Sequence, residues 1–149
     1  MRISFLCSIV LLAAACGSAP PPATGDEPLL VELRNNRIVF NHRIEFEHDS
    51  ATLVPEDDPI LDGVAAVLAE HEEIYQIQVQ GHTSAVGNAE HNQELSEARA
   101  AAIADALRER GVTQEITSQG YGPTYPVCQE DTDECHAQNR RVEFFVDTR

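Results

Sequence analysis

The chain has 149 residues, with 25 acidic residues against 10 basic ones, and its formal net charge is −15. This length allows one domain with short appendages. So large an acidic excess argues against nucleic acid as a partner, because phosphate contacts need a basic surface. It also argues against docking of a polybasic segment on anionic lipid. Every basic residue is arginine, so the few arginines in these acidic surroundings gain importance.

Residues 1–15 are predicted to be a secretory signal peptide. Arg2 precedes an apolar run that ends in small residues and is too short to span a bilayer. The ending Leu12-Ala13-Ala14-Ala15-Cys16 resembles the lipobox of bacterial lipoproteins, which implies cleavage before Cys16 and lipid attachment to that cysteine. Ordinary cleavage after Ala15, which would leave Cys16 unmodified, is the alternative.

Residues 16–28 are rich in Pro, Gly, Ser and Ala and are predicted to form a tether between the lipid and a domain at residues 29–149. Fully extended at about 3.3–3.6 Å per residue, the tether reaches roughly 45 Å. Gly17 and Ser18 follow the cysteine. The Asp that would indicate retention in the inner membrane is absent at these positions. We therefore expect an anchor in the outer membrane, with the domain facing the periplasm.

The domain is predicted to begin with extended segments. Two apolar runs flank Asn35-Asn36, which predicts a hairpin turn because Asn tolerates positive φ. Ile44 and Phe46 alternate with charged neighbours and predict a further strand. Residues 55–71 then predict a helix, whose expected apolar face consists of Ile60, Leu61, Val64, Val67, Leu68 and His71.

A strand at residues 74–80 and a helix from about Asn88 to Arg110 follow. In the strand, Tyr75, Ile77 and Val79 alternate with glutamines. The expected apolar positions of the helix are Leu95, Ala98, Ala102, Ile103, Ala106 and Leu107. Asn92, Ser96 and Arg99 recur at intervals of four and three, so they form a polar stripe beside that face.

Two more strands are predicted at residues 116–120 and 141–147, the last with Val142, Phe144 and Val146 facing one way. The order β-α-β-α-β-β predicts an α+β fold. We expect a two-layer sandwich in which a small mixed sheet carries its helices on one face.

The four cysteines indicate the cellular compartment in which the protein folds. If Cys7 leaves with the signal peptide and Cys16 carries lipid, Cys128 and Cys135 remain as a pair around an acidic segment. In an oxidising compartment these two are expected to form a disulfide. Metal binding is the rival interpretation, but with only His136 nearby the usual four-ligand pattern is missing.

Residues 80–100 resemble the signature of the OmpA/MotB/Pal family of peptidoglycan-binding domains. The signature consists of a Gly-His-Thr-Asp turn, an Asn, a Leu-Ser pair and an Arg-Ala pair. The positions that match it are Gly81, His82, Thr83, Asn92, Leu95, Ser96, Arg99 and Ala100. Ser84 stands where the family has its Asp. The resemblance implies the OmpA-like βαβαββ fold.

The resemblance also implies noncovalent binding of peptidoglycan through the diaminopimelate residue of its stem peptide. That ligand carries an ammonium and carboxylates, which call for a carboxylate and a guanidinium in the receptor. Arg99 matches the family's Arg, whereas Ser84 supplies no charge. A neutral hydrogen bond contributes about 1 kcal/mol and a charge-assisted one roughly twice as much. Three outcomes remain open: weaker binding to the same ligand, binding of a different stem-peptide residue, or replacement of the missing acid by Asp49 or Glu90.

The predicted peptidoglycan-binding residues are Arg99, Asn92, Ser84, Thr83, His82, Asp49, Leu95, Asn139, Arg140 and Arg141. The Asn-Arg-Arg triplet at 139–141 matches the family's triplet before its last strand. We expect one of its arginines to face the site and the other to bridge to acids. For Arg99, the alternative to ligand binding is an ion pair with Glu97 or Asp105 on its own helix. For Leu95, the alternative to ligand binding is burial in the hydrophobic core.

No catalytic site, metal or cofactor is expected. The chain has no Gly-x-Ser-x-Gly elbow, no His-Glu-x-x-His and no phosphate-binding glycine loop. The favoured function is a lipoprotein that binds peptidoglycan and links the outer membrane to the cell wall. The alternative is a protein-interaction lipoprotein on the same fold with weakened wall binding. A motor stator subunit of the MotB kind is disfavoured, because it needs an N-terminal transmembrane helix. Tol-like envelope proteins are implied as partners only by resemblance to Pal.

Overall fold

A five-stranded mixed sheet forms the centre of the computed structural model, which describes residues 28–149. In chain order the elements are β1 (Val31–Arg34), β2 (Arg37–Phe40), the 3-10 helix η1 (Pro55–Asp57), α1 (Asp58–Glu70), β3 (Ile74–Gly81), α2 (Ala89–Glu109), β4 (Glu115–Gly120), α3 (Asp133–Asn139) and β5 (Val142–Thr148). The strand order is β1-β2-β5-β3-β4, in which only β3 and β4 run parallel. The predicted signal peptide, Cys16 and nearly all of the tether lie outside the described residues.

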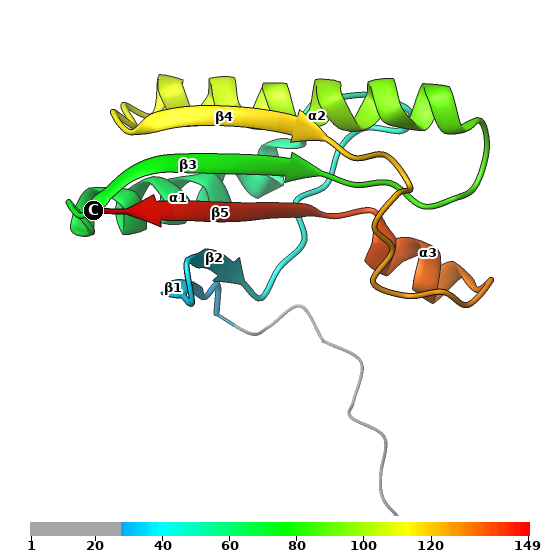
Figure 1. Ribbon diagram of the computed structural model, residues 1–149, viewed down its shortest axis with the longest axis horizontal. Coiled ribbons are helices and arrows are strands. Elements are labelled where there is room, and N and C mark those ends of the chain that lie inside the picture. Colours follow the sequence, from blue (N-terminus) through cyan, green and yellow to red (C-terminus); the bar gives the residue numbers. More distant parts are fainter. Residues whose placement is uncertain (1–27) are drawn as a thin grey trace, which may run out of the picture.

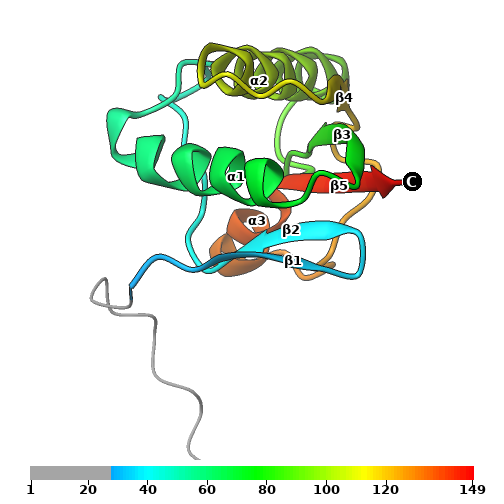
Figure 2. The ribbon, with the colours of Figure 1, turned by 90° about the vertical axis from the view of Figure 1, so that its left-hand side faces the viewer.

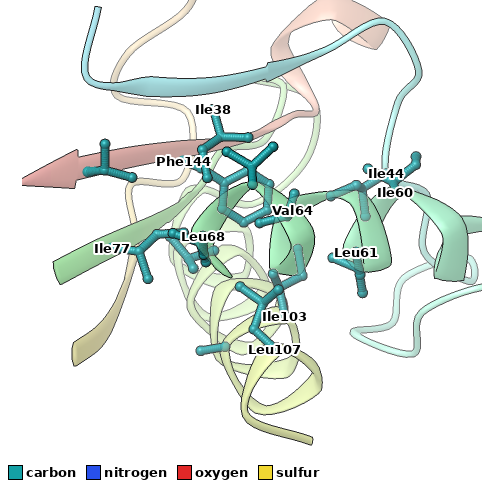
Figure 3. Close-up of a cluster of buried hydrophobic side chains, with 14 of the residues drawn as sticks. Ile38, Ile44, Ile60, Leu61, Val64, Leu68, Ile77, Ile103, Leu107 and Phe144 are labelled. Carbon is teal, nitrogen blue, oxygen red and sulfur yellow. The ribbon is translucent and has the colours of Figure 1, made fainter. Parts of the chain in front are cut away.

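Helices α1 and α2 lie together on one face of the sheet (Figure 2), which confirms the predicted two-layer α+β fold. The core fills the space between the two layers, as Figure 3 shows. Its fully buried side chains include Leu61, Leu68, Ile77, Ile103 and Phe144. Each such side chain contributes about 1.5–3 kcal/mol on burial. No helix within residues 28–149 combines the length and the apolar character needed to cross a bilayer.

The predicted hairpin is confirmed, and the strand predicted after it is not formed. Asn35 and Asn36 have φ values of 47° and 60° and join β1 to β2. Around Phe46 only an isolated bridge to Leu53 occurs. The reason is that the backbone there bonds within its own loop: Glu47 N donates to Thr52 O at 3.0 Å, and the amide of Glu45 donates to the carboxylate of Asp57.

One position of β3 departs from the predicted alternation. Ile74 pairs with Thr148 and Gln76 with Asp147, so Tyr75 is an extra residue in a bulge. Ile74 consequently turns into the core, and Tyr75 is exposed.

The buried face of α2 is rotated from the predicted one. Ala98 is exposed, and Leu95 is only partly buried and stays outside the core cluster, so its expected place in the core is wrong. The residues that do turn inward are Asn92, Ser96, Ala100, Ile103, Ala104 and Leu107. Two members of the predicted polar stripe therefore point at the sheet. On α1 the predicted apolar face is confirmed except for His71, which hydrogen-bonds to Glu73.

The carboxyl ends of β3 and β4 and the start of β5 lie at the end of the sheet where α3 is found (Figure 1). Helix α3 was not predicted. It occupies the acidic segment, where the side chain of Thr132 caps it by accepting from Cys135 N at 3.2 Å. The predicted disulfide between Cys128 and Cys135 is present, with 5.3 Å between the Cα atoms.

Close packing of α2 on the sheet predicts a cost for any side chain at Gly81. A Cβ there would lie 2.3 Å from the backbone oxygen of Ser96, and a backbone atom cannot simply rotate away. We expect Gly81→Ala to lower the free energy of unfolding by about 1–3 kcal/mol, measured by chemical denaturation. The control Ala101→Ser, at an exposed position of the same helix, should change it by less than about 0.5 kcal/mol. Equal stability of the two variants would contradict the close contact.

Candidate functional site

Backbone hydrogen bonds at the end of the sheet bring three separate loops together. His82 N donates to Arg141 O at 2.9 Å, and Thr83 N donates to Gly122 O at 3.0 Å. Tyr121 N donates to Gly81 O at 2.9 Å. The turn after β3, the loop after β4 and the segment before β5 thus form one surface beside the first half of α2.

A cleft of about 260 Å³ opens on this surface. Its lining residues are Arg43, Ile44, Glu45, Phe46, His82, Arg99, Arg140 and Arg141. Four arginines and one glutamate thus contribute to the lining. In a chain with a formal charge of −15, this is a local concentration of positive charge, and it favours an anionic ligand.

Arg99 is fixed by two contacts that leave part of its guanidinium free. Its Nε donates to Ser50 O at 2.9 Å, and its Cζ lies 4.9 Å from the ring centroid of Phe46. Burial lowers the pKa of Arg99 from its ordinary value, yet arginine stays charged at neutral pH. Within residues 28–149 neither Nη atom donates a hydrogen bond and no carboxylate forms an ion pair with it.

The alternative ion pairs for Arg99 on its own helix are not formed. Asp105 binds Arg108 instead, with 2.7 Å between Oδ1 and Nη1. Glu97 accepts from Gln93 Nε2 at 2.8 Å. The acids nearest to Arg99 in sequence therefore have other partners.

Arg140 and Arg141 both line the cleft and differ in their pairing. Arg141 binds Glu143, with 2.7 Å from Nε to Oε1, and donates to Tyr125 O at 3.1 Å. Arg140 is exposed and forms no ion pair in the described part of the chain. Arg43, which was not predicted from the sequence, is likewise exposed and unpaired there. Its only signal in the sequence is its place just before the apolar residues of the 44–46 segment.

His82 contributes a neutral polar group to the wall of the cleft. Only 5% of the residue is exposed, and neither ring nitrogen has a hydrogen-bond partner. The imidazole stacks on Tyr121, with 5.5 Å between ring centroids. Burial, with a smaller effect of the Arg141 charge, lowers the pKa of His82 to about 4. At neutral pH the ring therefore offers one donor and one acceptor without a charge.

Asn92, Asn139 and Ser96 hold loops in place. Asn92 Nδ2 donates to Val86 O at 2.9 Å and to Ser84 O at 3.3 Å. Asn139 Oδ1 accepts from Val127 N at 2.8 Å. Ser96 Oγ accepts from Gly122 N at 2.9 Å, which ties α2 to the loop after β4. None of the three lines the cleft; Asn139 borders a separate hollow.

Thr83, Ser84 and Leu95 also lie outside the lining of the cleft. Thr83 is buried, its Oγ1 has no partner, and it borders the hollow next to the disulfide. Ser84 is buried as well, with 6% of the residue exposed. The sequence motif therefore combines cleft residues with residues that shape the turn.

Asp49, one of the two acids considered as replacements for the family's Asp, has its own partner. Its Oδ1 lies 2.6 Å from Nε2 of His91 on α2. This contact lowers the pKa of Asp49 and raises the pKa of His91. Both groups are exposed, next to the Ser50 carbonyl that binds Arg99. In the part of the chain that the structure describes, no group of three or more His, Cys, Asp or Glu is arranged for a metal ion.

Comparison with known proteins shows the family. The OmpA family model matches residues 45–140, so this chain belongs to the OmpA family. The probable lipoprotein YiaD of Escherichia coli is 40% identical over 72% of this chain, which spans 50% of that relative's length. The peptidoglycan-associated lipoprotein of Legionella pneumophila is 29% identical over 98% of this chain and 94% of its own.

A solved structure supports the same assignment. The cell wall anchor of the T6SS from Pseudomonas aeruginosa superposes with a TM-score of 0.66 at 31% identity, over 81% of this chain and 88% of that one. The matched family region begins at residue 45 and ends at residue 140, so it includes Arg99 and excludes Arg43 and Arg141.

The environments of His82 and His91 predict pKa shifts in opposite directions. His82 should titrate near pH 4, and His91 above its ordinary value of about 6.5. For His82 the unfolded chain binds the proton first, so folding stability falls as the pH drops from about 6.5 to about 4. For His91 the contribution is present below about 6.5 and is lost as the pH rises through its folded pKa. Imidazole NMR titration checks both, with His82→Asn and His91→Asn assigning the signals. A His82 signal that moves near pH 6.5 would contradict the buried, neutral ring.

Proposed function

We propose that this protein is a lipid-anchored, non-enzymatic peptidoglycan-binding protein that links the outer membrane to the cell wall. The observation that carries the proposal is the Arg99 guanidinium, which enters the cationic cleft with both Nη atoms unused in the described part of the chain. The names of the Legionella and Pseudomonas relatives, a peptidoglycan-associated lipoprotein and a cell wall anchor, support it.

Arg99 is the proposed contact for a carboxylate of the stem peptide, with diaminopimelate as the carboxylate-bearing residue. The Ser50 carbonyl and the Phe46 ring fix the guanidinium before any ligand arrives. A carboxylate that accepts from both Nη atoms forms a bidentate, charge-assisted pair. Because the guanidinium is already partly buried, part of its desolvation cost is met in folding. Such a hydrogen bond to a charged group contributes about 1.5–3 kcal/mol.

The second end of the proposed link is Cys16. In this proposal residues 1–15 are removed as a signal peptide, Cys16 carries the lipid, and residues 16–28 join it to the domain at 29–149. A tether of roughly 45 Å keeps the cleft near the membrane surface. The link therefore requires the wall to lie close to the outer membrane.

A protein-interaction role is the second candidate, favoured by exposed apolar residues in the loops at the same end of the sheet. Val86, Tyr125 and Val127 are each between 57% and 59% exposed. Their loops adjoin in the hollow that contains Ala85 and Pro126. Envelope proteins of the Tol kind are the partner class that the family resemblance implies for such a surface.

The Arg99 contact predicts the outcome of a sedimentation experiment. We expect the full chain in detergent to co-sediment with peptidoglycan sacculi at low salt, and Arg99→Ala to weaken this binding by about tenfold or more, since one charge-assisted contact is lost. Arg108→Ala is the matched control, because Arg108 lies on the same helix but pairs with Asp105 on the surface. If wild type and Arg99→Ala sediment equally, the cleft is not the binding site. If wild type stays in the supernatant, the interaction role replaces wall binding.

Lipid attachment at Cys16 predicts the location of a variant. In bacterial cells, Cys16→Ser should move the protein from the membrane fraction to the soluble periplasmic or secreted fraction, because lipid chains supply the membrane affinity. Labelling with a radioactive fatty acid should mark wild type and Cys7→Ser, and should leave Cys16→Ser unlabelled. A labelled Cys16→Ser variant would show that the anchor lies elsewhere.

A further inference from the structure

The charges in the wall of the cleft are arranged for carboxylates and not for an ammonium group. Arg43, Arg99 and Arg140 have no carboxylate partner within residues 28–149, and Arg141 adds a fourth positive charge. With His82 neutral, four arginines against the single acid Glu45 give the lining a formal charge of +3, although the Arg141 charge is paired with Glu143 outside the lining. A cation entering this space meets like charges, which is unfavourable.

The acids near the cleft offset this charge only in part. Asp49 binds His91 at 2.6 Å and lies outside the lining, from where its charge acts on Arg99 without a direct contact. Glu143 binds both Arg141 and Arg37, at 2.7 and 2.6 Å. Glu45 is exposed and also borders a neighbouring hollow that contains two further acids.

His82 shows what kind of neutral group the cleft accepts. It is 95% buried, it lines the cleft, and both of its ring nitrogens lack partners. Its neutral ring can donate to a carbonyl and accept from an amide N–H when a ligand reaches its buried nitrogens. Beside it a neutral amide is matched better than an ammonium, for which Glu45 is the single charged acceptor among the lining residues.

We infer, on the basis of the proposed wall binding, that the cleft recognises the carboxylates at the diamino acid of the stem peptide and makes no use of the free amine of that residue. Cross-linking of the wall acylates this amine and converts it to an amide. The protein consequently binds cross-linked stem peptides as well as free ones. Its binding sites on the wall then include cross-linked stem peptides in addition to uncross-linked ones.

The test compares three synthetic stem peptides that contain diaminopimelate, using calorimetry on the full chain in detergent. The first has its amine free, the second has it acetylated, and the third has it acetylated with the side-chain carboxylate amidated. We expect acetylation to leave the affinity within about twofold or to strengthen it. Amidation of the carboxylate should weaken binding by about tenfold or more, as the loss of one charge-assisted contact would.

A substitution in the wall of the cleft tests the same point from the side of the protein. Arg140→Glu places a carboxylate at an exposed lining position, so it should make binding of the free-amine peptide several-fold tighter than binding of the acetylated one. Arg140→Gln is the control of equal size without the charge, and should show no such preference. Thermal melts of both variants confirm that they are folded.

The outcomes separate this inference from the proposed function. If the wild-type chain binds neither sacculi nor peptides, wall binding itself is wrong. If it binds sacculi but no stem peptide, or if acetylation weakens peptide binding tenfold or more, the inference is overturned while wall binding stands. Equal affinity for the acetylated peptide with and without its carboxylate also overturns it.

Discussion

The site depends on how closely helix α2 approaches the ends of β3 and β4. Gly81 and Gly120 have no side chains, and a Cβ on either would lie 2.3 Å from a backbone atom of the helix, at Ser96 and Glu97 respectively. The hydroxyl of Ser96 then accepts from the backbone of Gly122. These contacts fix the rotation of α2 about its axis. Arg99, three residues further along the helix, is thereby directed across the sheet end to the Ser50 carbonyl.

Charge pairing separates the arginines that brace the fold from those that are free to bind. Arg110 contacts Asp58 and Asp62 at 2.5 and 2.8 Å and so connects α1 to α2. Pairs whose carboxylates are exposed, as those of Asp58 and Asp62 are, contribute little each, about 0–1 kcal/mol, but in an acidic chain they take up much of the positive charge. The arginines of the cleft that stay unpaired within the described residues are therefore a better sign of function than the total number of arginines.

Local patterns were sufficient for most elements, and tertiary packing decided the rest. The Asn35-Asn36 turn and the ends of α2 follow from rules that act within a few residues. The rotation of α2 does not, because alanines occur on several of its faces and the close contact selects the face with Ser96. The exposure of Tyr75 depends on pairing with β5, which lies far away in sequence. In the site, Arg99 was identified through its motif, whereas Arg43 has no motif and is recognisable only once folding has placed it beside the cleft.

The same geometry determines which solution conditions control the cleft. Guanidinium charges persist at any physiological pH, and His82 stays neutral well below neutral pH because its pKa is about 4. The positive charge of the cleft wall is therefore nearly constant around neutrality. The His91–Asp49 pair, in which the pKa of His91 is raised, lies outside the lining. Screening by salt acts on exposed charges such as Arg43 and Arg140 over distances of about 8–10 Å at physiological ionic strength. Ionic strength, more than pH, is thus the condition to which an anion held in this cleft responds.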